Sequence, residues 1–116
     1  MLEAEDLRSK KKVAWKRMLK TTNNMSREIE VLEKMRWSPN VIKMENYFFS
    51  KNYCDQIIQN IVLELGECDL EKYIFKIRDK RKDRMTLDEV KKMMKQVVTG
   101  IRDMHSLNIC HRDMKP

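Results

Sequence analysis

A run of apolar residues at helical spacing dominates the C-terminal third of this 116-residue chain. Each member follows the one before it by three or four positions: Leu87, Val90, Met94, Val97, Ile101 and Met104. Thr86 and Glu89 at its start match a capping box, in which each side chain satisfies a backbone N–H of the first turn. The pattern predicts an amphipathic helix that must bury one face, so we expect a folded chain and not a disordered one.

Three segments ahead of this helix predict strands. Residues 12–18 can form one strand, and side-chain alternation then places Lys16 on the same face as apolar neighbours. Two runs of β-branched and aromatic residues, 41–49 and 56–65, are separated by a polar connection and predict an antiparallel pair.

Two further segments predict helices. The first follows N-cap candidates at 21–24 and ends at a Trp-Ser-Pro break. Its apolar residues recur at helical spacing: Met25, Ile29, Leu32 and Met35. Glu28 lies beside this apolar stripe. A short helix over 70–74 follows Asp69, and the basic run 76–84 is expected to be a solvated loop.

Composition excludes several kinds of site. The chain has two glycines, so its sequence contains no Gly-rich phosphate-binding loop. Cys54, Cys68 and Cys110 form no C-x-x-C pair, which argues against a disulfide framework or a zinc knuckle and favours a reducing, cytoplasmic location. His105 and His111 are six positions apart, a spacing that does not place two imidazoles on one helical face, so no metal site is expected.

The net charge of +7 raises the question of an anionic partner. The basic residues gather at 8–12 and 76–84, and neither run contains an aromatic residue for base stacking, so solvated surface is favoured over nucleic acid. The longest uncharged stretch near the middle is far short of the roughly 20 apolar residues that cross a membrane, and the start is acidic. We expect no membrane segment here, although a longer parent could be membrane-attached.

The last six residues, His-Arg-Asp-Met-Lys-Pro at 111–116, resemble the H-R-D-x-K-P catalytic loop of serine/threonine protein kinases. Other landmarks of that family precede it in order. Residues 13–16 resemble its V-A-x-K strand motif, Glu28 resembles the glutamate of helix αC, and residues 38–42 resemble the turn that follows. The resemblance implies an α+β fold: part of the N-lobe antiparallel sheet with helix αC, the hinge, and helices αD and αE of the C-lobe.

The resemblance also implies roles for charged residues. Lys16 would supply a cation to the α and β phosphates of ATP, and Glu28 would hold that lysine in place. Asp113 would accept or orient the proton of the substrate hydroxyl, and Lys115 would offset the charge of the transferred group.

Five residues are implied around the nucleoside of ATP. Ala14 would form the roof of the adenine pocket and Leu63 its gatekeeper. Glu64 would offer the hinge carbonyl, Gly66 belongs to the backbone pair that bonds the base edge, and Asp69 would bind the ribose hydroxyls.

The resemblance covers only the middle of a kinase domain. Residues 1–10 are expected to be a disordered extension, 11–65 part of the N-lobe, and 66–116 the hinge and the start of the C-lobe. The Gly-rich loop, the magnesium-binding Asn and the D-F-G aspartate are outside these residues, so the Mg²⁺ ligands are too. We predict that the 116 residues alone transfer no phosphate.

Within the kinases, the residues V-A-W-K-R-M at 13–18 and the run 105–116 are most similar to the inositol-requiring sensor kinases of the unfolded-protein response. The substrate implied is a protein with a Ser or Thr hydroxyl. Two alternatives stay open: a non-catalytic module that pairs with a full-length kinase relative through the helix Leu87 to Met104, and a basic nucleic-acid-binding helical domain. Taken alone, Lys16 and Glu28 could be a surface ion pair worth under about 1 kcal/mol.

Overall fold

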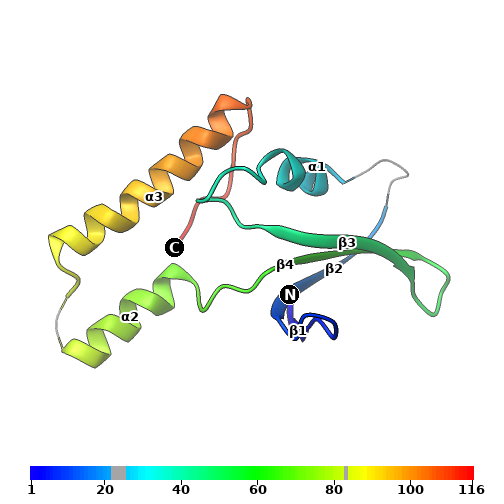
Figure 1. Ribbon diagram of the computed structural model, residues 1–116, viewed down its shortest axis with the longest axis horizontal. Helices are drawn as coiled ribbons and strands as arrows, with labels where there is room; N and C mark the ends of the chain where they lie inside the picture. The colour runs from blue at the N-terminus through cyan, green and yellow to red at the C-terminus, as the bar shows by residue number, and fades with distance from the viewer. Residues whose placement is uncertain (22–25, 83) are drawn as a thin grey trace. The chain divides into compact units, whose positions relative to one another are not determined.

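The computed structural model describes residues 1–21, 26–82 and 84–116 (Figure 1). The chain divides into two compact units, Met1–Leu65 and Gly66–Pro116. Within the described residues the first unit holds four strands and one helix and the second holds two helices: β1 (Leu2–Glu5), β2 (Lys12–Leu19), α1 (Arg27–Lys34), β3 (Met44–Lys51), β4 (Ile57–Glu64), α2 (Leu70–Arg81) and α3 (Leu87–Ser106). The predicted α+β class is confirmed.

The four strands form one antiparallel sheet in the order β1-β2-β4-β3. The predicted pairing of β3 with β4 is confirmed, with Tyr47 opposite Ile61. On the other side of β4, Lys16 of β2 also lies opposite Ile61. The register therefore brings β2 and β3, which are far apart in the sequence, to the two edges of one central strand.

The expectation of a disordered extension over residues 1–10 is wrong for β1. Leu2–Glu5 pairs with β2, where Glu3 lies opposite Ala14. Asp6 then closes the turn back to β2 through its backbone bonds with Lys10 and Lys11. The cause is non-local: β2 would otherwise expose unpaired backbone N–H and C=O groups, and pairing satisfies them.

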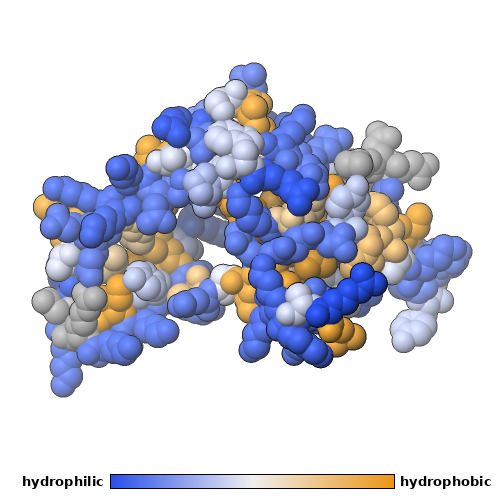
Figure 2. All heavy atoms as spheres, in the orientation of Figure 1, coloured by the Kyte–Doolittle hydropathy of each residue, from blue (hydrophilic) through white to orange (hydrophobic). Residues whose placement is uncertain are grey.

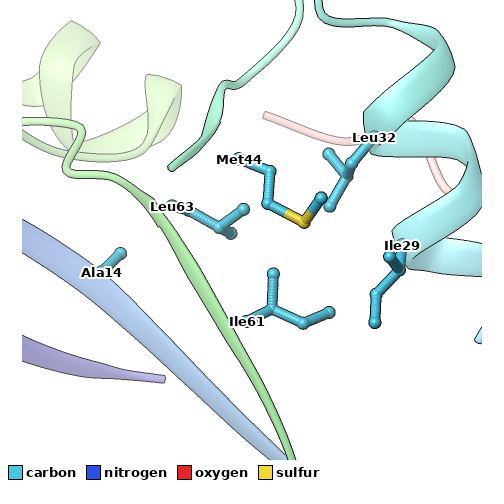
Figure 3. Close-up of a cluster of buried hydrophobic side chains, with 6 residues drawn as sticks. All are labelled: Ala14, Ile29, Leu32, Met44, Ile61 and Leu63. Carbon is cyan, nitrogen blue, oxygen red and sulfur yellow. The ribbon is translucent and has the colours of Figure 1, made fainter. Parts of the chain in front are cut away.

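Helix α1 covers one face of the sheet through an apolar cluster (Figure 3). Its members come from α1 and from β2, β3 and β4: Ala14, Ile29, Leu32, Met44, Ile61 and Leu63. Ile29 and Ile61 are fully buried, and burial of such a side chain contributes about 1.5–3 kcal/mol. This contact fixes which side of α1 faces the sheet.

The helix begins later than the N-cap candidates at 21–24 suggest. Ser26 is the N-cap, and its hydroxyl accepts a hydrogen bond from the backbone N–H of Glu28 at 3.3 Å. Residues 22–24 and Met25 are outside the described residues. Ser is among the preferred N-caps, because its oxygen satisfies a donor that the first turn leaves unpaired.

The opposite face of the sheet carries a buried polar network around Asn60. Its Oδ1 accepts a hydrogen bond from the indole Nε1 of Trp15 at 3.1 Å. Its Nδ2 donates to the hydroxyl of Ser50 at 2.9 Å and to the carbonyls of Phe48 and Ile58. Asn60 is fully buried, and these bonds offset the cost of burying an amide.

Helix α2 is longer than predicted. The short helix expected over 70–74 extends to Arg81, so residues 76–81 of the expected loop are helical. Lys and Arg are good helix formers, so a charged run between two helical segments does not by itself indicate a loop. The helix ends at Lys82, whose backbone is left-handed with φ 52°.

Helix α3 confirms the strongest prediction, including the capping box of Thr86 and Glu89. Its predicted apolar stripe is partly exposed: Leu87 is 68% exposed, Met94 44% and the neighbouring Val98 58%. Figure 2 shows apolar residues at the surface among a majority of hydrophilic ones. Neither α3 nor any other helix in the described ranges combines the length and apolarity that crossing a bilayer requires.

Candidate functional site

Lys16 and Glu28 meet in an ion pair inside the first unit. The Lys16 ammonium Nζ donates to both carboxylate oxygens of Glu28, at 2.7 Å to Oε1 and 2.9 Å to Oε2. About a third of each side chain is exposed, so the pair is accessible and partly shielded. The pair combines a fixed cation with access to solvent, which is what a binder of phosphate groups requires.

Strand alternation and helix packing place the two side chains together. Ala14 and Met18, two residues on either side of Lys16, belong to or pack against the apolar cluster under α1. Lys16 therefore points to the same face as they do. Glu28 lies in the first turn of α1, next to the buried Ile29, so the helix brings its carboxylate over that face.

Ala14 and Leu63 are register partners on β2 and β4, and both are nearly fully buried. Both side chains belong to the apolar cluster under α1, and Ala14 lies two residues from Lys16 along β2. The neighbouring Glu64 uses its side chain structurally: Oε1 accepts a hydrogen bond from the backbone N–H of Lys43 at 2.8 Å. The carboxylate of Glu64 therefore ties the end of β4 to the start of β3.

In the second unit, the carboxylate of Asp69 serves as the N-cap of α2. Its Oδ1 accepts a bond from the backbone N–H of Lys72 at 2.8 Å, and its Oδ2 pairs with the Lys72 ammonium at 3.0 Å. These bonds, first that from the backbone N–H, hold the pKa of Asp69 below its ordinary value. Gly66 is exposed, its φ is not positive, and a Cβ there would meet no atom within 4 Å, so neither backbone strain nor crowding requires glycine.

Asp113 and Lys115 lie side by side after α3. The Lys115 ammonium is 3.2 Å from Oδ2 of Asp113, and both side chains are 73% exposed. The backbone N–H of Asp113 donates to Nδ1 of His111 at 3.2 Å, so this imidazole shapes the loop. Arg112 between them has φ 67°, a left-handed conformation that is uncommon for a residue other than Gly.

The structure thus describes the expected site residues in two groups. Ala14, Lys16, Glu28, Leu63 and Glu64 belong to the first unit, and Gly66, Asp69, Asp113 and Lys115 belong to the second. Among the described residues, no group of three or more His, Cys, Asp or Glu is arranged to hold a metal ion. The three cysteines are exposed free thiols.

Sequence reasoning missed two residues that support the first group. Lys43 donates its ammonium to backbone carbonyls just after α1, and Asn60 binds Trp15, the neighbour of Lys16. For Asn60 a weak signal exists, because an amide in the middle of an apolar strand needs partners. For Lys43 the sequence offers none, since its partners are main-chain atoms.

The protein kinase domain family matches residues 2–116, nearly the whole chain. The chain belongs to the protein kinase domain family. This match includes β1.

Proteins named as serine/threonine kinases are among the relatives of this chain. It is 30% identical over 103 residues to the Probable serine/threonine-protein kinase MRK1 homolog of Encephalitozoon cuniculi, covering 89% of the chain and 30% of that protein. It is 31% identical over 106 residues to serine/threonine-protein kinase RIM11/MSD1 of Saccharomyces cerevisiae, covering 90% and 28%. It is 27% identical over 117 residues to protein kinase gsk3 of Schizosaccharomyces pombe, covering 100% and 30%. The chain therefore spans less than a third of the length of these relatives.

Proposed function

We propose that this chain binds ATP and, as part of a complete kinase domain, helps to transfer the terminal phosphoryl group to Ser or Thr hydroxyls of proteins. The observation that carries the proposal is the two-pronged contact between Lys16 and Glu28, at 2.7 and 2.9 Å. Lys is flexible and strongly hydrated, so a carboxylate that fixes it prepares a cation for phosphate oxygens. The kinase family and the names of the relatives support the same chemistry.

The residues of the first unit suit a nucleotide. Lys16 would hold the α and β phosphates, and the apolar side chains of Ala14 and Leu63, register partners on β2 and β4, would line the adenine site. By the kinase resemblance, the main-chain groups of Glu64 and, in the second unit, Gly66 would bond the base edge, and Asp69 of the second unit would bind the ribose hydroxyls. When bound, ATP with Mg²⁺ would supply the phosphoryl group and offset its charge, and the resemblance assigns the metal ligands to motifs that these 116 residues do not contain.

Asp113 and Lys115 would act on the acceptor. An exposed Asp113 carboxylate can accept the hydroxyl proton of a protein Ser or Thr at its Oδ atoms. Lys115, whose ammonium lies 3.2 Å from Oδ2 of that carboxylate, can offset charge on the transferred group. The proposed substrate is thus any protein that presents a Ser or Thr hydroxyl to Asp113.

The test has two parts. Purified residues 1–116 are titrated with ATP by equilibrium dialysis, and binding is expected to weaken at least tenfold in Lys16→Ala. The same preparation is incubated with labelled MgATP, and no autophosphorylation is expected, because the ligands of the metal are outside the chain. ATP binding that is indifferent to Lys16→Ala would refute the proposed phosphate role, and measurable autophosphorylation would refute the predicted inactivity.

A second candidate function is favoured by the exposed stripe of α3. Leu87, Met94 and Val98 are large apolar residues that α3 leaves partly or mostly in solvent. Such residues on one helix are typical of a surface that pairs with another protein. A non-catalytic module that pairs with a full-length kinase relative would co-purify with it in fixed stoichiometry, without nucleotide, and Val98→Lys would abolish this.

The finer resemblance, to the inositol-requiring sensor kinases, is part of the proposal and is supported by motif residues alone, chiefly those at 13–18 and 105–116. Sequencing the transcript beyond codon 116 tests it. The frame would continue into an Asn two residues on and then D-F-G, followed by the ribonuclease extension of that subfamily. A cytoplasmic, reducing location is proposed from the three free cysteines.

A further inference from the structure

Lys43 lies in the loop between α1 and β3 and holds the end of the helix. Its ammonium Nζ donates to the carbonyl oxygen of Arg36 and to that of Ser38, each at 2.6 Å. These carbonyls lie one and three residues past the C-cap Met35, in the segment that leaves the helix, so the ammonium ties that segment down. A lysine at this end also opposes the negative pole of the helix dipole.

The main chain of Lys43 is itself fixed to the end of β4. Its N–H donates to Oε1 of Glu64 at 2.8 Å, and its carbonyl accepts from the N–H of Glu64 at 2.9 Å. The next residue, Met44, is buried in the apolar cluster beneath α1. The main chain at Lys43 is therefore fixed by Glu64 of β4 and by the buried neighbour Met44, and the Lys43 ammonium extends from this fixed backbone.

Helix α1 is consequently held by lysines at both ends. Lys16 from β2 pairs with Glu28 in the first turn, and Lys43 binds the carbonyls that follow the last turn. With eight residues the helix is too short to be stable without such contacts. Ile29 and Leu32 fix which side of the helix faces the sheet, and the two lysines limit rotation and sliding along it.

We propose that Lys43 is a positioning residue for the Lys16–Glu28 pair, an inference that rests on the proposed binding of ATP. Loss of its ammonium would free the C-terminal end of α1 and let the whole short helix shift. Glu28 would then lie over Lys16 for a smaller fraction of the time, and the cation would lose its fixed place. Lys43 acts through the helix and touches no nucleotide.

The test is a double-mutant cycle read out as affinity for ATP. Lys43→Met is expected to weaken ATP binding about tenfold in the wild-type background. In the Glu28→Gln background the same change is expected to have less than a twofold effect, because the pair it positions is already broken. Lys43→Arg, which keeps a cation that can donate to two carbonyls, should restore binding to within about threefold of wild type.

Lys51→Met is the matched control. Lys51 is the last residue of β3, the strand that follows Lys43, and its ammonium pairs with Asp55 in the turn between β3 and β4. This variant loses the same charge and should bind ATP like the wild type. Equal weakening by Lys43→Met in both Glu28 backgrounds, or none in a folded variant, would overturn the inference.

Hydrogen exchange supplies a measurement that needs no nucleotide. In Lys43→Met the amides of residues 31–34 in α1 should exchange faster, and those of Ile61 and Leu63 in β4 should keep the wild-type rate. Unchanged exchange in α1 would overturn the inference whatever ATP does. If wild-type protein binds no ATP while α1 exchange responds as expected, the proposed function has failed and the anchoring of α1 by Lys43 stands.

Discussion

The indole Nε1 of Trp15 donates a hydrogen bond to Oδ1 of Asn60 at 3.1 Å, on the face of the sheet opposite Lys16. The guanidinium of Arg17 lies over the same indole, 5.0 Å from its ring centre. A slip of one residue between β2 and β4 would break this bond and turn Lys16 away from Glu28, because alternate residues face opposite sides. The Trp15–Asn60 bond therefore stabilises the β2–β4 register in which Lys16 can pair with Glu28.

The first prediction concerns this bond. Trp15→Phe removes the donor and leaves Oδ1 of the fully buried Asn60 without it, so we expect a loss of about 1–3 kcal/mol in the free energy of unfolding. Urea denaturation followed by circular dichroism measures it. Trp37→Phe is the control, because Trp37 is 57% exposed, and its effect should stay within about 0.5 kcal/mol. Equal losses of unfolding free energy in the two variants would show that the Trp15–Asn60 bond does not contribute measurably to stability.

The second prediction separates binding from stability at Glu28. Glu28→Gln removes the charge that fixes Lys16, so affinity for ATP should fall about tenfold, a size typical of lost positioning. Because a third of the pair is exposed, the free energy of unfolding should change by under about 1 kcal/mol. Glu30→Gln provides the comparison, since Glu30 is exposed in the same first turn and should leave affinity unchanged. If Glu28→Gln lost much stability but kept its affinity for ATP, Glu28 would be a residue that stabilises the fold and not one that positions Lys16.

The third prediction concerns the N-cap of α1. Ser26→Ala deletes the acceptor for the Glu28 backbone N–H and should cost about 1 kcal/mol in unfolding free energy. Ser26→Asp keeps an acceptor and should stay close to the wild type. Thermal unfolding measures both, and an Ala variant as stable as the Asp variant would mean that the cap contributes little.

The fourth prediction is a pH dependence at Asp69. Its pKa lies below the ordinary value of 3.8, because the backbone N–H of Lys72 and then the Lys72 ammonium bond its carboxylate. Since the folded-state pKa is the lower one, the stabilisation is complete above the ordinary pKa and is lost as the pH falls below 3.8 through the folded pKa. Carbon-detected NMR titration of the carboxyl group should give a midpoint below 3.8. In Asp69→Asn the acid-induced loss assigned to this group should vanish, whereas a midpoint at or above the ordinary value would contradict the cap.

Local signals made part of this fold predictable from the sequence. The capping box and apolar spacing of α3 are properties of neighbouring residues, and so are the β-branched runs of β3 and β4. β1 was missed because Leu-Glu-Ala-Glu has little strand preference and gains it only by pairing with β2. The pairing of Lys16 with Glu28 followed from the kinase resemblance, whereas Lys43 and Asn60 support the site through contacts that no local pattern encodes.

The sheet order also bears on how the chain acquires its ion pair during synthesis. By the time residue 34 has been made, β1, β2 and α1 are all present, yet β2 lacks its inner neighbour, because β4 is made of residues 57–64. Ile61, a fully buried member of the apolar cluster under α1, belongs to that late strand. A nascent chain therefore carries Lys16 and Glu28 early but gains the surface that aligns them only after β4 leaves the ribosome. Pausing before that point would leave α1, too short to persist alone, without a place to dock.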